Sequence, residues 1–248
     1  MLVNRTIFKS LLTAASLLTA FLTGGARASE DWSFAGEVYG WLPTIESEAA
    51  GTTTEISRGD LLEDLDFTAM FALRAYRENW SLNTDVIYFD ISDKIRAPLD
   101  ETLELKKLGL EAWIVTPTVG YQIVSTDSYR MEVYGGGRFL WIEANLDLES
   151  LPSPGVSTKV SESSSNWDAI IGVRGRYEFA DRWAVNYAAD IGAGESDSVL
   201  QANLGLGYRF ERVETVFGWR YLDYDIGSDT SPEELTVNGP YAGLVFRF

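Results

Sequence analysis

Arginines and carboxylates recur at alternate positions in several segments of the chain. Arg174 and Arg176 stand two residues apart, as do Arg130 and Glu132. Because successive side chains of a β-strand point to opposite faces, each such pair shares one face of its strand. Basic and acidic groups brought together on a face can form ion pairs or line a charged pore. The charged residues expected on the inward faces are Glu37, Arg74, Asp85, Arg130, Glu132, Arg138, Asp168, Arg174, Arg176, Asp190, Arg209, Glu214, Arg220 and Arg247.

The residue types do not point to catalysis. The chain has no histidine and no cysteine, so a serine hydrolase would need a substitute base such as lysine. The lysines that could act as this base lie in or near expected loops, and no matching serine motif accompanies them. They are Lys94, Lys106, Lys107 and Lys159. Neither a His/Cys metal set nor a phosphate-binding loop motif occurs. We therefore expect no enzyme activity, no cofactor and no metal site.

The charge balance is strongly acidic, with 37 Asp and Glu against 20 Lys and Arg and a net charge of −17. Such a chain is a poor partner for nucleic acid. Much of the acid excess falls in expected loops. Without cysteine, no disulfide frame stabilises the fold, so backbone pairing and side-chain packing must do so.

Alternation of apolar and polar residues predicts strands throughout. In 201–210, Ala202, Leu204, Leu206 and Tyr208 alternate with glycine or polar residues, which has no helical interpretation. We predict an all-β fold, a single closed antiparallel up-and-down barrel of about ten strands, with eight or twelve as alternatives. The predicted strands are 32–43, 66–77, 80–92, 108–124, 129–147, 166–179, 183–194, 198–210, 213–226 and 235–248.

The predicted connections alternate between short turns and long loops. The long segments are 44–65, 93–107, 148–165 and 227–234, and within the third of these Ser161–Ser165 is expected to be a flexible tip. Aromatic residues beside the short turns predict one interfacial ring. A second ring is expected nearer the long loops, from Trp41, Tyr88, Trp113, Trp141, Trp219 and Tyr221.

The arginine-rich face lies opposite a broad apolar face, which favours a transmembrane barrel, because a small soluble barrel fills its interior with apolar side chains. At the N-terminus, Arg5 and Lys9 precede an apolar run and the small-x-small sequence Ala26–Ala28. This pattern predicts a cleaved signal peptide at 1–28 and a barrel domain at 29–248. Short turns are then expected to face the periplasm and long loops the outside.

The C-terminal strand ends in an aromatic residue. It resembles the signal that targets outer-membrane β-barrels of Gram-negative bacteria to their assembly machinery, with Tyr241, Leu244, Phe246 and Phe248 as the residues that carry the resemblance. This ending predicts residence in the cell outer membrane.

Several longer stretches resemble a family of small, largely uncharacterised Gram-negative outer-membrane β-barrel proteins. They are 60–67 (DLLEDLDF), 113–121 (WIVTPTVGY), 172–177 (GVRGRY), 181–183 (DRW), 201–210 (QANLGLGYRF), 218–225 (GWRYLDYD) and the Gly-Pro to Phe-Arg-Phe ending. The resemblance implies the fold and the location. It implies no established activity.

Two functions are open at this point. In the first, the inward charges pair into a salt-bridged network that closes the lumen, and the barrel has a structural or surface-binding role. In the second, the same charges line a narrow porin-like channel for small solutes or ions. Outer-membrane lipid, lipopolysaccharide and the barrel-assembly machinery are the expected partners, with a monomer favoured and the oligomeric state otherwise open.

Overall fold

The computed structural model describes residues 32–49, 52–59, 65–93, 97–98, 103–150, 157–227 and 233–248. The predicted signal peptide lies outside these residues. Residues 34–248 form one compact unit, and this unit contains the barrel. No helix among the described residues is both long and apolar enough to cross a membrane.

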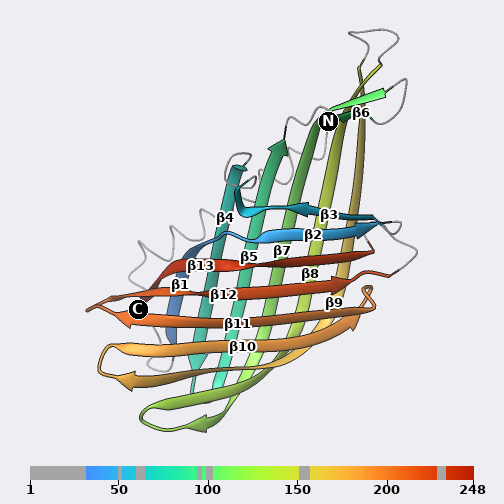
Figure 1. Ribbon diagram of the computed structural model, residues 1–248. Helices are drawn as coiled ribbons and strands as arrows, with labels where there is room; N and C mark the ends of the chain where they lie inside the picture. The colour runs from blue at the N-terminus through green and yellow to red at the C-terminus, as the bar shows by residue number, and fades with distance from the viewer. Residues whose placement is uncertain are drawn as a thin grey trace. The chain divides into compact units, whose positions relative to one another are not determined.

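Within the described residues, ten strands close a ring (Figure 1). The ring closes because the first strand pairs antiparallel with the last, from Ala35 opposite Arg247 to Trp41 opposite Tyr241. In order around the ring, the strands are β1 (Ser33–Trp41), β4 (Leu65–Arg77), β5 (Trp80–Asp93), β7 (Leu103–Ser125), β8 (Tyr129–Ser150), β9 (Ser157–Ala180), β10 (Trp183–Gly194), β11 (Ser198–Arg209), β12 (Val213–Asp225) and β13 (Glu234–Arg247). The predicted all-β fold, the closed antiparallel barrel and the count of ten are confirmed.

The alternation in the sequence sets which side chains face outward. In β11, Leu204 and Leu206 are exposed on the outer wall, whereas Gly205 and Gly207 are buried on the inner face. The two glycines leave room for inward side chains from other strands. A Cβ at Gly207 would lie 2.3 Å from a carboxylate oxygen of Glu214, and one at Gly205 would lie 2.3 Å from the Tyr241 hydroxyl. The inner face therefore packs tightly against opposing strands.

The segment predicted as the first long loop contains two strands. β2 (Thr44–Ala49) continues the pairing of β1 with β13, since Trp41 opposite Tyr241 and Thr44 opposite Asn238 belong to one register. Between them, Pro43 has no N–H for the ladder, which interrupts the strand. β3 (Thr52–Ile56) then pairs with the other edge of β2.

The predicted loops 93–107 and 148–165 are also partly wrong. β7 begins at Leu103 and pairs with the short β6 (Ala97–Pro98), while β8 and β9 extend to Ser150 and from Ser157. The expected flexible tip Ser161–Ser165 lies in β9 and pairs with β8. Figure 1 shows β7, β8 and β9 rising beyond the other strands. The stretch Ser161–Ser165 contains no apolar residue, so hydrophobic alternation gave no signal there, although backbone pairing needs none.

Candidate functional site

Arg220 of β12 and Asp85 of β5 form an ion pair inside the ring, with Nη1 3.2 Å from Oδ2. These two strands are not neighbours, because β13, β1 and β4 lie between them on the shorter side of the ring. Tyr39 of β1 joins both residues. Its hydroxyl accepts a hydrogen bond from Arg220 Nη1 at 2.9 Å and donates one to Asp85 Oδ1 at 2.7 Å. The pair therefore links distant walls of the barrel.

Aromatic rings surround the Arg220 guanidinium. Its central carbon lies 5.1 Å from the ring centre of Tyr39, 5.5 Å from that of Trp41 and 5.8 Å from that of Tyr241. Cation–π attraction of this kind is strongest where water is excluded. The expectation that Trp41 belongs to an outer aromatic ring is wrong: its side chain is buried and donates to the carbonyl of Gly239. Its odd position, shared with Tyr39, puts it on the inner face.

Arg138 of β8 and Asp190 of β10 form the most enclosed ion pair, with Nη1 2.9 Å from Oδ1 and exposed side-chain fractions of 0% and 1%. Arg138 also donates from Nη2 to Asp190 Oδ2 and from Nε to the Thr116 hydroxyl. Asp190 Oδ2 accepts further hydrogen bonds from the Tyr134 hydroxyl and the Gln201 amide. The two charges are thus paired inside the lumen, although Arg138 Nη1 and Asp190 Oδ1 make no hydrogen bond. Pairing is the condition for keeping charges in such a place.

Asp168 has a different partner from the other inward carboxylates. It is buried, and its two oxygens accept hydrogen bonds from the backbone N–H and the hydroxyl of Ser196, at 2.8 and 2.9 Å. Ser196 lies in the connection between β10 and β11. Asp168 therefore fixes that connection over the barrel end.

Two further pairs lie closer to the short turns. Arg174 of β9 pairs with Glu132 of β8 and donates to the hydroxyls of Thr118 and Ser81. In β4 and β1, Arg74 Nη2 lies 2.9 Å from Glu37 Oε2. Both arginines have their carboxylate partner on an adjacent strand, but Arg174 also reaches past β8 to hydroxyls on β7 and β5.

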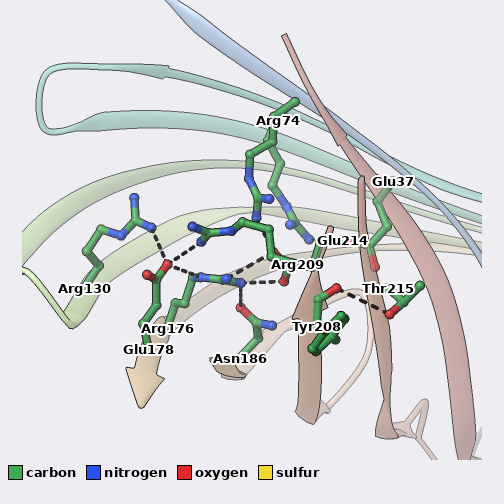
Figure 2. Close-up of polar contacts among 11 residues, drawn as sticks. Glu37, Arg74, Arg130, Arg176, Glu178, Asn186, Tyr208, Arg209, Glu214 and Thr215 are labelled. Carbon is green, nitrogen blue, oxygen red and sulfur yellow. Dashed lines mark hydrogen bonds and ion pairs between the residues drawn. The ribbon is translucent and has the colours of Figure 1, made fainter. Parts of the chain in front are cut away.

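At the end of the barrel that carries the short turns, four arginines surround two glutamates. We call this group the turn-end cluster. Its members are Arg130, Arg176, Glu178, Arg209, Glu214 and Arg247. Arg176 donates to both oxygens of Glu214, at 2.6 and 3.0 Å, and its Nε lies 3.0 Å from Glu178. Figure 2 shows Arg130, Arg176 and Arg209 converging on Glu178. Arg247 joins at Glu214, 2.7 Å away.

Glu178 was not predicted among the inward charges. Glu178 stands two residues after Arg176 on the same strand face and only two before the end of β9. Strand parity therefore carried a signal for it. In the structure it accepts from three guanidinium groups, which makes it the most shared carboxylate of the lumen.

Apolar side chains fill the lumen towards the long loops, and we call them the apolar layer. Leu222 and Tyr224 of β12 and Val199 of β11 are fully buried. They belong to one packed cluster with Leu235 and Val237 of the neighbouring β13 and with residues of β5, β7 and β8 from across the ring: Ile87, Phe89, Ile91, Ile114 and Leu140. The inward charges predicted from the sequence are thus only part of the lumen, since an apolar layer follows the charged one.

The outer wall is apolar and edged with aromatic pairs. Ile171, Leu204 and Phe217 are 67%, 59% and 65% exposed. Beside the short turns, Trp80 packs on Tyr121 with ring centres 5.0 Å apart, and further around the ring Trp183 packs on Tyr208 at 4.8 Å. A closed antiparallel barrel with an apolar outside and charges inside is the architecture with which strands cross a membrane.

The C-terminal residues divide between the two faces of β13. Leu244, Phe246 and Phe248 are exposed on the outer wall, whereas Tyr241 is buried and contacts Asn203 through its hydroxyl at 3.2 Å. The terminal residue is held in the barrel seam, because Phe248 and Phe34 exchange backbone hydrogen bonds of 3.0 and 3.1 Å. Their role as an assembly signal stays a prediction.

Comparison with solved structures finds matches of low sequence identity. The outer membrane protease OmpT from Escherichia coli matches with a TM-score of 0.44 and 11% identity, covering 89% of this chain and 98% of that one. Ail, the attachment invasion locus protein of Yersinia pestis, matches with a TM-score of 0.37 and 10% identity over 88% and 99%. Neisserial surface protein A matches with 0.37 and 12% over 88% and 97%. No family model and no curated protein sequence matches the chain.

Proposed function

We propose that the protein is an integral outer-membrane β-barrel of a Gram-negative bacterium, with a closed lumen and a structural or surface-binding role. The observation that carries the proposal is the filling of the lumen from opposite walls. Arg220 reaches Asp85 across the ring, and the apolar layer next to it joins β5 and β8 to β12. A solute moving along the barrel would have to displace both layers.

The outer wall supports residence in a membrane. Large apolar side chains are exposed around the ring, and a water-soluble monomer rarely exposes an apolar surface of such extent. The predicted signal peptide and the apolar C-terminal strand agree with export to the outer membrane. Outer-membrane lipid and the barrel-assembly machinery are the partners that this proposal requires, and the acidic segments near the long loops suit lipopolysaccharide bridged by divalent cations.

A catalytic role is not part of the proposal. With no histidine in the chain, the usual proton acceptor of serine hydrolysis is missing. The buried carboxylates of the lumen already accept from arginine, tyrosine or serine donors. Asp190, Asp168 and Glu214 are thereby held as ion-pair or hydrogen-bond partners.

Cell fractionation tests the membrane part of the proposal. The protein is expected in the outer-membrane fraction and should migrate faster on a gel without boiling than after boiling, because a folded barrel stays compact in detergent. Recovery as a soluble periplasmic protein would overturn it.

The second candidate function is a narrow channel for small solutes or ions, and the charged wall near the short turns favours it. Recording from the purified barrel in a planar bilayer separates the two. A closed barrel is expected to give no discrete conductance steps. Gel migration verifies that the barrel is folded, and its insertion into the bilayer is verified independently. Steps that change in size when Arg138, Arg174 or Arg220 is neutralised would instead support the channel.

A further inference from the structure

The turn-end cluster holds more positive than negative charge. Arg130, Arg176, Arg209 and Arg247 share only Glu178 and Glu214, so two guanidinium charges are left without a carboxylate of their own. The nearby pairs do not correct this surplus. Arg74 with Glu37 and Arg174 with Glu132 are each neutral in sum.

The surplus charge lies where a ligand can reach it. Arg130, Arg209 and Arg247 keep 55%, 38% and 45% of their side chains exposed, whereas Arg176 keeps 14% and Glu214 only 1%. The buried members therefore form a fixed floor, and the exposed arginines stand at the barrel opening. Figure 2 shows Arg130 and Arg209 reaching Glu178 from different directions.

One donor in the cluster is also unused. Among the described residues, Nε of Arg209 is buried without a hydrogen-bond partner, although its Nη2 donates to Glu178 at 2.6 Å. A buried donor that lacks a partner costs free energy. An oxyanion in the opening would recover this cost once the partly exposed Arg209 side chain turns its Nε edge towards it. Guanidinium donors are arranged to bind two oxygens of one oxyanion.

From the charge surplus, the exposure and the unused donor, we propose that the turn-end cluster binds a phosphate-type oxyanion that enters from the periplasmic side. A phosphate group carries nearly two negative charges at neutral pH and several acceptor oxygens, so one group matches the two unpaired charges. The acids of the neighbouring turns, Asp181 and Glu211, are exposed, and salt screens their repulsion. This inference is independent of whether the lumen is closed.

Calorimetric titration of the folded full-length barrel with inorganic phosphate tests the proposal. The detergent is uncharged and contains no phosphate, and sodium chloride keeps the ionic strength constant. Arg209→Gln removes one charged donor and is expected to weaken binding about tenfold. Arg209→Lys keeps the charge but loses the paired donors, so its affinity is expected between that of the glutamine variant and the unchanged chain.

Arg212→Gln is the matched control, because Arg212 lies in the exposed turn between β11 and β12, at the same end of the barrel. It removes the same charge, and binding should change by less than about twofold, since an exposed distant charge is screened. Unboiled gel migration verifies that each variant is folded. No heat of binding beyond that of chloride, or equal loss in Arg209→Gln and Arg212→Gln, would overturn the site.

A second titration distinguishes the two sources of such a phosphate. Glycerophosphoglycerol presents the phosphodiester of a lipid headgroup without the acyl chains. Binding as tight as that of inorganic phosphate, and equally sensitive to Arg209→Gln, supports a headgroup at the opening. Binding of inorganic phosphate alone supports a free phosphate or a phosphate monoester.

Discussion

The two ends of the lumen are filled by different physical means. Towards the long loops, Leu222, Tyr224 and Val199 are fully enclosed in an apolar layer. Towards the short turns, Arg130 and Arg247 retain about half of their exposure while pairing with glutamates. Apolar packing excludes water from one end, and ion pairs tolerate water at the other. The enclosed pairs of Arg138 and Arg220 lie between these two regimes.

This difference shows that the contribution of a charged lumen residue to stability depends on how far water reaches it. Exposed ion pairs contribute little, because water and salt screen them. Enclosed pairs make removal of one partner expensive, because the other charge is left in a poor solvent. The cost of a substitution should therefore rise with distance from the short turns, even between arginines.

The largest effect is expected for Asp190→Asn. It leaves the charge of Arg138 without a counter-charge at a site with no exposure, and this should lower the free energy of unfolding by about 3–5 kcal/mol. Urea unfolding of the barrel, followed by tryptophan fluorescence, measures it. Combining it with Arg138→Met should restore much of the loss. A cost near that of an exposed pair would mean that water reaches Arg138.

Leu222→Ala probes the apolar layer. Because Leu222 is fully buried, its truncation leaves a cavity, and we expect a loss of about 2–5 kcal/mol. Leu204→Ala on the neighbouring strand is the control, since Leu204 is 59% exposed on the outer wall, where lipid or detergent fills the space. For Leu204→Ala, the loss in free energy of unfolding should be about 1 kcal/mol, which comes from the smaller apolar surface alone, because no cavity forms. Urea unfolding measures both variants. Equal losses in free energy of unfolding for Leu222→Ala and Leu204→Ala would contradict a packed lumen.

Arg130→Gln should have a small effect, at most about 1 kcal/mol, because its pair with Glu178 is exposed and Glu178 keeps two other arginines. The loss should shrink further in high salt. Unfolding midpoints at low and high sodium chloride measure both. A loss as large as that of Asp190→Asn would show that the turn end is as dry as the middle of the lumen.

The smallest effect is expected for Tyr224→Phe. Among the described residues, the Tyr224 hydroxyl is buried without a hydrogen-bond partner, so its removal should be neutral or stabilise by about 0.5 kcal/mol. Thermal unfolding in detergent measures the change. Clear destabilisation would indicate a bound partner for the hydroxyl inside the apolar layer and would weaken the distinction between the two ends.

Strand parity predicted a great deal of this arrangement. It placed Arg138, Arg220 and Asp190 on inward faces, because a strand alternates strictly between its two faces. The same parity puts Trp41 inside. It was predicted in the outer aromatic ring because of its nearness to a long loop, and its position in the strand was given less weight. The aromatic ring beside the short turns was predicted from the nearness of its residues to those turns, and not from parity.

Partner identity was not predictable in the same way. Which carboxylate meets Arg220 depends on the stagger of strands around the ring, and no local pattern sets this stagger. The pairing of Arg220 with Asp85, and the sharing of Glu178 among three arginines, appear only once the ring closes. The apolar layer was missed for a related reason, since its members come from strands far apart in sequence.

Conductance of a barrel with a thinned apolar layer tests the central claim most directly. Leu222→Ala combined with Tyr224→Ala removes two fully buried side chains, and Leu204→Ala combined with Phe217→Ala removes two exposed ones from the outer wall. In planar bilayers, the account predicts no conductance steps for the unchanged barrel or the outer-wall variant, and discrete steps for the lumen variant. Steps of equal size in all three would contradict it.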